Sequence, residues 1–403
     1  MSRKWWAVLL AAVVLLSAAV TTGAHLAGWP AAGDAPRPAT ELWSSAGDQE
    51  EPLGSWFSSG SLVVARRSSL TGYRATDGGT AWRATGRSLA GDPRADALCG
   101  MSGGARDGLG VVAYGTSTSD LAVDCTGVAL VDLRTGEPIW RHRLPTAPGR
   151  GARAEFVGDL VLLSWDDHVM AVRAADGGEV WRGSAEPGCH LSGPALGPAV
   201  VLPQRCPGGS RLVLRDAADG ARIADRALGS APMPQAISAD PPVVNTDTTE
   251  PDRLLLFARD GSATGILDLD YTGLDVLPKN APRPGFPRRY PFAVVGGRLI
   301  GTAGEGRSIT SVDLRSGRLG PVEPGDGVGT APVAVTGGDV VFAGPGEAGV
   351  FTWSPGQRAR RPRLGSIARL NPVGDDLHLD GSALYGVSSE SPQLYAVRRG
   401  TRP

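Results

Sequence analysis

Adjacent carboxylates and scattered histidines are the side chains of this chain that could transfer protons. Asp166-Asp167 and Asp375-Asp376 could do acid–base chemistry if burial raised the pKa of one member of a pair. Both pairs are predicted to lie in hairpin loops, where solvated turns are the simpler interpretation. No histidine belongs to a His-x-x-x-His or Glu-x-x-His pattern, so the sequence predicts no metal centre. The five histidines are His25, His142, His168, His190 and His378.

Two loops resemble ion-binding motifs without completing them. Residues 301–308 read GTAGEGRS, in which Arg307 stands where a phosphate-binding loop needs lysine, and no helix is predicted to follow. A hairpin is therefore the expected structure. Residues 268–273 read DLDYTG, like the start of a calcium loop, but Lys279 occupies the position of the bidentate glutamate. The sequence also lacks a Gly-x-Ser-x-Gly elbow, so nothing supports serine hydrolysis.

The four cysteines indicate an oxidising compartment. Cys99 and Cys125 bracket the strands of one predicted repeat, and Cys189 and Cys206 bracket those of another. Disulfide partners need Cα atoms within about 7 Å of each other, so pairing inside each repeat is favoured over the other connectivities. Each bridge would contribute about 2–4 kcal/mol to stability. Four buried thiols are the alternative, whereas zinc binding lacks a Cys-x-x-Cys pair.

A recurring motif supplies the elements that must position these residues. It consists of a strand-like apolar run, an Asp-Gly or Thr-Gly turn, and a tryptophan four residues after the turn glycine, at 73–83, 130–141 and 171–182. Glycine accepts the positive φ of tight hairpins, and a large ring on the returning strand can fill the space between neighbouring sheets. The pairs are Gly78 with Trp82, Gly136 with Trp140, and Gly177 with Trp181.

Weaker copies of the motif continue to the end of the chain. Asp132 and Asp313 precede the turn in two copies, and one copy has Ala224 at the tryptophan position. The turn glycines are roughly 40 to 58 residues apart, close to the ~40–50 residues of a four-stranded propeller blade. The later turn glycines are Gly220, Gly261, Gly317, Gly356 and Gly400.

The repeats predict an all-β propeller, because one four-stranded sheet cannot bury both of its faces and must stack on others. We expect eight blades, with seven as the alternative if the fifth and sixth repeats merge. The last repeat stops at Pro403, before the strand that would carry its tryptophan. Glu41-Leu42-Trp43, near the start, resembles such a strand but has no turn motif in front of it. We therefore expect Trp43 to complete the last blade and close the ring. The alternative is that Trp43 packs on a linker.

The N-terminus has the pattern of an export signal. Ser2-Arg3-Lys4 is positive, and no charged residue follows from Trp5 to Gly33. Because the uncharged span to Trp29 exceeds the ~20 residues that cross a bilayer, we expect an uncleaved transmembrane helix with the propeller outside the cytoplasm. Cleavage at Thr22-Gly23-Ala24, followed by secretion, is the alternative.

The predicted organisation is thus a hydrophobic membrane segment at 1–30, a Pro/Ala/Gly-rich tether at 31–40 and a propeller at 41–403. The formal net charge is -1 at pH 7, so the sequence predicts no nucleic-acid partner. Two basic loops, 279–290 and 358–363, could meet anionic lipids or an acidic polymer of the envelope. Solvated connections are the alternative for both loops.

The repeat resembles the PQQ-like repeat over roughly residues 40–403. This repeat builds quinoprotein alcohol dehydrogenases and also the BamB-like propellers of bacterial envelopes. The resemblance therefore implies a fold without implying one function. Resemblance to the dehydrogenases would imply a PQQ near the ring axis with Ca²⁺, an Asp base and often a disulfide between adjacent cysteines. This chain has no adjacent cysteines and no acidic cluster that maps onto those positions.

We therefore expect neither PQQ nor calcium as a cofactor, and no catalytic residue. The expected function is a membrane-anchored, extracytoplasmic binding module or scaffold for a protein or ligand of the cell envelope. One alternative is a PQQ-dependent or other oxidoreductase with a site on the ring axis. Another is a sensor that passes ligand binding to the membrane through Trp5–Trp29. The sequence names no partner and no oligomeric state.

Overall fold

The computed structural model describes most of the chain beyond residue 38. The described ranges are 39–46, 50, 52–119, 122–144, 151–231, 234–246, 253–268, 292–303, 308–320, 323–324, 331–336, 339–344, 349–353, 361–364, 376–388 and 393–398. The chain divides into two compact units, Met1–Arg37 and Pro38–Pro403. The predicted membrane segment 1–30 lies outside the described residues. Within the described ranges, no helix is long and apolar enough to span a bilayer.

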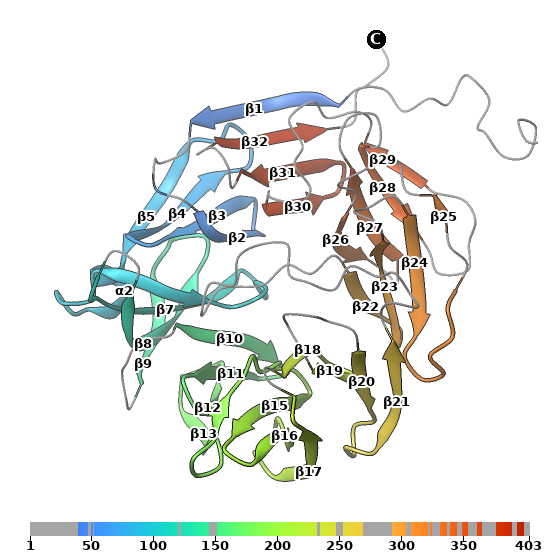
Figure 1. Cartoon of the computed structure of the whole chain (residues 1–403). Helices are drawn as coiled ribbons and strands as arrows, with labels where there is room; N and C mark the ends of the chain where they lie inside the picture. The colour runs from blue at the N-terminus through green and yellow to red at the C-terminus, as the bar shows by residue number, and fades with distance from the viewer. Residues whose placement is uncertain are drawn as a thin grey trace, which may run out of the picture. The chain divides into compact units, whose positions relative to one another are not determined.

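Eight antiparallel sheets of four strands each make up the unit Pro38–Pro403, and we number them as blades 1 to 8 (Figure 1). The prediction of an all-β, eight-bladed propeller is confirmed, and the seven-bladed alternative is wrong. In blades 1 to 7 the strands follow one another in the chain from the centre of the ring to its rim.

The first four blades have these strands, named from the centre outward. Blade 1 contains β2 (Pro52–Ser58), β3 (Ser61–Arg66), β4 (Ser69–Arg74) and β5 (Thr80–Thr85). Blade 2 contains β6 (Ala97–Met101), β7 (Leu109–Ser117), β8 (Val123–Asp132) and β9 (Pro138–Arg143). Blade 3 contains β10 (Ala152–Val157), β11 (Leu160–Trp165), β12 (His168–Arg173) and β13 (Glu179–Ser184). Blade 4 contains β14 (His190–Leu191), β15 (Ala199–Cys206), β16 (Gly209–Asp216) and β17 (Arg222–Gly229).

The other four blades follow the same plan. Blade 5 contains β18 (Gln235–Ala239), β19 (Pro242–Asn245), β20 (Arg253–Phe257) and β21 (Ala263–Asp268). Blade 6 contains β22 (Phe292–Val295), β23 (Arg298–Ala303), β24 (Ser308–Asp313) and β25 (Glu323–Pro324). Blade 7 contains β26 (Ala331–Thr336), β27 (Asp339–Gly344), β28 (Gly349–Trp353) and β29 (Arg361–Leu364). Blade 8 contains β30 (Asp376–Asp380), β31 (Ala383–Val387), β32 (Gln393–Arg398) and β1 (Thr40–Ala46).

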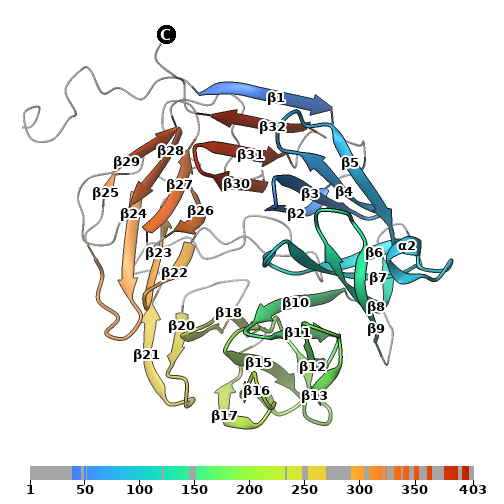
Figure 2. The same ribbon diagram turned by 180° about the vertical axis from the view of Figure 1, so that it is seen from behind.

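The ring is closed by the first strand of the chain. β1 pairs antiparallel with β32, and Trp43 lies opposite Ala396 in this pair. The view from behind shows β1 as the rim strand of blade 8, beside β5 of blade 1 (Figure 2). The prediction that the strand of Trp43 completes the last blade is therefore confirmed. Closure of this kind leaves no blade face without a neighbour.

Hydrophobic clusters fill the eight seams between neighbouring blades. In the seam of blades 8 and 1, for example, Tyr385 and Leu394 pack with Leu62. Because a blade is covered on both faces, its middle strands are buried at almost every residue, as in β3, where all six residues are buried. Each fully buried aliphatic side chain contributes about 1.5–3 kcal/mol, so the seams carry most of the hydrophobic stabilisation.

Each repeat tryptophan docks on the turn of the following blade. The Nε1–H of Trp140 donates to the carbonyl oxygen of Ala174 at 2.8 Å, and the indole lies against Gly177. Gly177 has φ +71°, and a Cβ there would come within 2.8 Å of the Trp140 ring. The same contact joins Trp43 to Gly78, Trp82 to Gly136, and Trp181 to Gly220. Their indoles donate to the carbonyl oxygens of Ala75, Leu133 and Ala217 respectively.

The tryptophan contact is not repeated at every seam. Ala224 replaces the tryptophan on β17 and lies directly against Gly261 of blade 5. Gly317 keeps the left-handed turn conformation with φ +68°, but no atom of the described residues lies within 4 Å of the place a Cβ would take. Gly356 and Gly400 lie outside the described residues. In the part of the chain that the structure describes, the tryptophan contact therefore joins blades 8, 1, 2, 3 and 4.

Two local details differ from the sequence-based expectations. A short helix, α2 (Gly86–Ala90), connects blades 1 and 2 and is capped by the Thr85 side chain, which accepts from the Ser88 N–H. Its five residues are too few to show a helical period in the sequence. Asp376 is the first residue of β30 rather than part of a hairpin loop, so that expectation was wrong. An inner strand has one edge on the ring centre, where a carboxylate can reach water.

Candidate functional site

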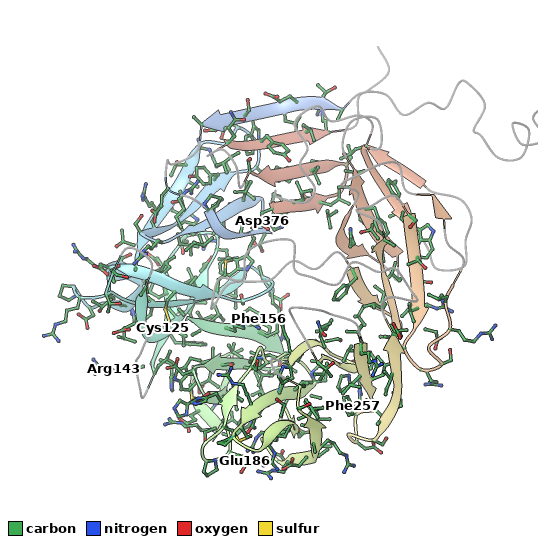
Figure 3. All side chains as sticks on the ribbon, viewed as in Figure 1. Cys125, Arg143, Phe156, Glu186, Phe257 and Asp376 are labelled. Atoms are coloured by element: carbon green, nitrogen blue, oxygen red, sulfur yellow. A yellow bond between two sulfur atoms is a disulfide. The ribbon has the colours of Figure 1, made fainter. Side chains whose placement is uncertain are left out.

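The inner strands carry chemistry-bearing side chains at one repeated position. Trp56, Glu155 and His378 each lie two residues before the last paired residue of the first strand in blades 1, 3 and 8. Asp376 and Phe156, from two of these strands, lie on the side of their blades that faces the centre of the ring (Figure 3). The candidate site near the ring axis consists of these inner-strand residues and one more: Ser55, Trp56, Glu155, Phe156, Asp376 and His378.

His378 bonds across the seam that closes the ring. Its Nε2 lies 2.8 Å from the hydroxyl oxygen of Ser55, which is 8% exposed. The two residues are 323 positions apart in the sequence and meet only because blade 8 returns to blade 1. Asp376 lies two residues from His378 on β30, so both belong to one face of the strand. A serine beside a histidine can act as a nucleophile only with oxyanion donors as well.

Among the described acids, Glu155 has the largest shift in pKa. Burial raises its pKa to about 7, although a hydrogen bond from the Gly103 N–H, at 3.2 Å, favours the charged form. The contact is close, because a Cβ on Gly103 would come within 2.6 Å of the Glu155 carboxylate. Ala154, the preceding residue, forms a parallel bridge with Ser102 of blade 2. Glu155 therefore fastens blade 3 to blade 2, and it could also exchange a proton near neutral pH.

Neighbouring polar contacts also run between blades. The Trp56 Nε1–H donates to the Ser102 carbonyl oxygen at 3.0 Å, which joins blade 1 to blade 2. Arg153 donates to the Pro194 carbonyl oxygen at 3.1 Å, which joins blade 3 to blade 4. The polar side chains of the inner strands are thus used to hold the ring together. Sequence reasoning missed these contacts, since each needs two blades to be placed side by side.

The predicted acid pair Asp166-Asp167 lies in the turn between β11 and β12. Asp167 accepts from the Leu191 N–H at 2.8 Å and lies 2.8 Å from the Nδ1 of His190. These bonds attach the turn of blade 3 to the first strand of blade 4. The second predicted pair is only half described, because Asp375 lies outside the described residues.

The remaining described histidines also have local structural contacts. His142 Nδ1 lies 3.1 Å from the Gly177 carbonyl oxygen, beside the docked Trp140. The His168 ring packs on Trp165, with 5.4 Å between ring centroids. His25 lies outside the described residues. Over the described ranges, no group of three or more His, Cys, Asp or Glu side chains is placed to hold a metal ion.

Both predicted disulfides are confirmed. Cys99 on β6 is bonded to Cys125 on β8, with 6.0 Å between their Cα atoms. Cys189 is bonded to Cys206, at the end of β15, with 4.2 Å between Cα atoms. Figure 3 labels Cys125, which lies within blade 2. Each bridge is internal to one blade, as proximity within a repeat predicts.

The two motif-like loops have the expected simple structures where they are described. Ala303 pairs with Ser308 across the β23–β24 hairpin, so the glycine-rich stretch 301–308 is confirmed as a hairpin. Asp268 is the last residue of β21, and the rest of the calcium-like stretch, with Lys279, lies outside the described residues. The basic loop 279–290 also lies outside them.

A PQQ and calcium site of the dehydrogenase kind needs carboxylates that converge on one ion. The described acids of the inner strands, Glu155 in blade 3 and Asp376 and Asp380 in blade 8, belong to blades that do not adjoin. Glu155 is moreover bonded to the backbone of blade 2. The described residues do not fit such a site, and the expectation of no PQQ and no calcium stays a prediction.

Exposed arginine–aspartate pairs cap two of the repeat turns. Arg74 pairs with Asp77 at 3.1 Å, and the Gly79 N–H together with Arg74 lowers the pKa of Asp77. Arg173 and Asp176 form the same pair in blade 3. A Cβ on Gly79 would come within 2.1 Å of the Arg74 guanidinium. The second glycine of the Asp-Gly-Gly sequence is therefore the signal that predicts this pair.

Comparison with known proteins assigns the repeat to a family. A sequence profile described as outer membrane protein assembly factor BamB matches residues 66–318. Among solved structures, BamB from Moraxella catarrhalis has 16% sequence identity to this chain and a TM-score of 0.50, with 91% of this chain and 99% of that chain covered. A search of curated proteins found no match.

Two quinohemoprotein alcohol dehydrogenases have the same fold. The enzyme ADHIIG from Pseudomonas putida has 12% identity and a TM-score of 0.50, with 91% of this chain and 77% of that chain covered. The enzyme from Comamonas testosteroni has 10% identity and a TM-score of 0.51, with the same two coverages. Identities this low establish a shared fold and nothing more. Because the family profile spans more than half of the 403 residues, this chain belongs to the BamB family of PQQ-like-repeat propellers.

Proposed function

We propose that this propeller is a non-catalytic binding scaffold of the bacterial cell envelope. The proposal rests on the hydrogen bonds that polar side chains near the ring axis form with neighbouring blades. Ser55 and Glu155 each bond to a neighbouring blade, and so does Arg153. Side chains engaged in such contacts make the ring rigid, and a rigid ring presents its loops and rim to a partner in fixed positions.

Three features support an envelope location. The chain belongs to a family whose profile is described as an outer membrane protein assembly factor. It also has two disulfides, and its N-terminus has the pattern of an export signal. The proposal places Trp5–Trp29 across the membrane and the propeller outside the cytoplasm. N-terminal sequencing of the protein purified from membranes tests this: an uncleaved anchor leaves residues 5–29 on the mature chain, whereas cleavage near Ala24 removes them.

Exposed aliphatic side chains on the rim, one on the outermost strand of each of five blades, are the positions that we assign to contact with a protein partner. Ile139 is 52% exposed and lies one residue before the tryptophan position of blade 2, and Ile266 is 65% exposed and lies one residue after that position in blade 5. These strands are the outermost of their sheets, so one edge of each has no neighbouring strand in its sheet. Apolar residues on such edges are surfaces that partner proteins cover. We call this set the rim aliphatics: Leu42, Ile139, Val180, Ile223 and Ile266.

Affinity capture from detergent-solubilised envelope tests the scaffold. The bait is the full-length tagged protein, compared with Ile139→Arg, Ile266→Arg and the control Ala81→Arg. Ala81 is exposed in blade 1 at the repeat position of Ile139, one residue before the tryptophan, so the control adds the same charge without removing a large aliphatic side chain. We expect a stoichiometric partner with the wild type and the control, and loss of it with at least one isoleucine variant. No partner at any of several salt concentrations contradicts the proposal.

An enzyme with an axial site is the second candidate, and Glu155 is the observation that favours it. A carboxyl whose pKa is raised to about 7 suits acid–base catalysis at neutral pH. Titration calorimetry of the purified protein with PQQ and Ca²⁺ separates the two functions. The scaffold predicts no saturable heat, whereas saturable binding that Glu155→Gln abolishes favours the enzyme.

A further inference from the structure

A buried arginine in the seam between blades 8 and 1 has no part in the proposed scaffold function. Arg66 is the last residue of β3 and only 1% exposed. Its Nε–H donates to the Glu50 carbonyl oxygen at 3.0 Å, and its Nη1–H donates to the Tyr73 hydroxyl at 3.3 Å. Both acceptors are neutral. The Glu50 carboxylate is turned to Ser68, where it accepts from the N–H at 2.9 Å and from the hydroxyl.

Two buried hydroxyls on the same side of the blade lack partners. Ser69 and Thr71 are 0% and 2% exposed, and neither hydroxyl has a hydrogen-bond partner among the described residues. Val64 lies opposite Thr71 in the β3–β4 pair, and directly opposite residues share a face of a sheet. Arg66 and Ser69 are the next residues in this register, at the ends of the two strands. Arg66, Ser69 and Thr71 therefore share one face, at the same end of blade 1.

That face looks into the seam between blades 8 and 1. Val64 packs there with Tyr385 and Leu394 of blade 8. The hydrophobic cluster around Val64 offers few acceptors to a polar group, and in the same seam the Ser55 hydroxyl and the His378 imidazole already bond to each other. An isolated buried cation destabilises the folded state unless an opposite charge accompanies it. Buried donors without acceptors add to this destabilisation.

One bound anion removes all of these costs together. A guanidinium has N–H donors beyond the two that Arg66 uses, and each hydroxyl supplies one O–H donor. An anion accepts hydrogen bonds without donating any, and it neutralises the arginine charge. No carboxylate of the described residues forms an ion pair with Arg66, whereas a water molecule would leave the charge uncompensated.

We propose that Arg66, Ser69 and Thr71 form a binding site for a small inorganic anion of the chloride class, buried in the seam that closes the ring. The anion joins the donors of blade 1 at the place where the first and last strands of the propeller meet. Its binding stabilises the closed ring, since a ligand that binds only the folded state raises stability with concentration.

Thermal unfolding of the full-length protein in detergent tests the site. Chloride is titrated against gluconate at constant ionic strength, and bromide serves as a second probe. We expect the melting temperature to rise with chloride and to saturate. Thr71→Val keeps the shape of the side chain but removes one donor to a charge, so chloride should bind roughly tenfold more weakly or worse. Ser69→Ala should act in the same direction.

Arg66→Met should abolish the chloride dependence, and Arg74→Met is its matched control. Arg74 is an exposed arginine in the same blade and is already paired with Asp77, so its replacement should leave the chloride response unchanged. If Arg66→Met does not fold, the Thr71 and Ser69 variants still decide the question. An equal chloride response in wild type and Thr71→Val contradicts the site.

Anomalous diffraction from crystals grown in bromide locates the ion directly. A bromide peak within hydrogen-bond distance of Arg66 and at least one of the two hydroxyls supports the proposal. A water at this place overturns it. So does a Glu50 carboxylate that has turned from Ser68 to pair with Arg66.

Discussion

At the residue scale, the contact between an indole and a glycine explains why the motif recurs. The Trp140 ring occupies the place where any side chain on Gly177 would lie, and its Nε1–H bonds to Ala174 of the same turn. Glycine is needed at this turn for two reasons, its left-handed φ and the space taken by the indole. The two reasons can be separated by experiment, since Gly317 has the same conformation without the indole.

We predict that Gly177→Ala destabilises the protein more than Gly317→Ala does. Both glycines have positive φ, near +70°, so both substitutions have a conformational cost of about 1–2 kcal/mol. Only Gly177 faces an indole, and a Cβ 2.8 Å from the Trp140 ring forces a shift that adds about 1–3 kcal/mol. Urea unfolding of the two variants measures the difference. Equal losses of stability would mean that the indole does not restrict this position.

Glu155 should make stability depend on pH. Its folded pKa of about 7 lies above the ordinary value of 4.5, so the folded state holds the proton more tightly than the unfolded state. Stability from this group is therefore full below pH 4.5 and is lost as pH rises through about 7. Part of the side chain is exposed, so we expect a loss of about 1–2 kcal/mol.

Urea unfolding at pH 5 and pH 8 measures this loss. Glu155→Gln cannot ionise, so the variant should lose less stability than the wild type between the two pH values. Glu137→Gln is the control, because Glu137 is exposed on a turn and its replacement should leave the pH difference unchanged. If the wild type and Glu155→Gln lose the same amount of unfolding free energy between pH 5 and pH 8, then Glu155 is well hydrated.

At the element scale, ring closure depends on β1, a strand that lies far from its partner in the sequence. β1 covers the edge of β32 and brings Trp43 into the seam with Tyr73. Without β1, the β32 edge and one side of the seam face water, and an open strand edge favours pairing with another chain.

We predict that a chain lacking residues 1–46 unfolds at a lower temperature than one lacking residues 1–38. The shorter deletion keeps β1 (Thr40–Ala46), whereas the longer one removes it together with Trp43. Size-exclusion chromatography should also show association of the longer deletion only. Matching melting temperatures and monomeric profiles would mean that blade 8 is stable with three strands.

The elements were easier to predict from the sequence than the contacts of the site. Turn glycines, alternating strands and tryptophan spacing are local signals, and they predicted the blades, the closure by Trp43 and both disulfides. The Ser55–His378 bond joins residues 323 positions apart and has no local signal. Arg66 at the end of an apolar strand looks like a solvated strand end, yet it is buried in the structure, with its guanidinium bonded to Glu50 and Tyr73.

At the scale of the whole molecule, the ring is not uniform. The described tryptophan contacts and both disulfides belong to blades 8 and 1 to 4. At the next seam, Ala224 stands in place of a tryptophan, and Gly317 of blade 6 has no described neighbour within 4 Å of the place where a Cβ would lie. A seam that buries a large ring and satisfies its N–H opens less readily than one closed by small side chains.

Hydrogen exchange should therefore differ between the two sides of the ring. We predict slower amide exchange in the middle strands of blades 1 to 3 than in those of blades 5 and 6 at neutral pH. Replacing Trp140 with alanine should raise exchange in blades 2 and 3 toward the level of the other side. Uniform protection around the ring would show that the tryptophan contacts do not set local stability.

The scaffold itself is tested most directly in intact cells. A photo-crosslinking amino acid placed at Ile139 or Ile266 in the full-length chain reports what covers the rim aliphatics in the envelope. Placement at Ala81 reports on the repeat position of Ile139 in a blade that has no large exposed aliphatic side chain there. The scaffold predicts one crosslinked partner protein from at least one isoleucine position, formed more strongly than from Ala81. Absence of any specific crosslink from both isoleucine positions, in cells where the protein is present at its normal level, contradicts it.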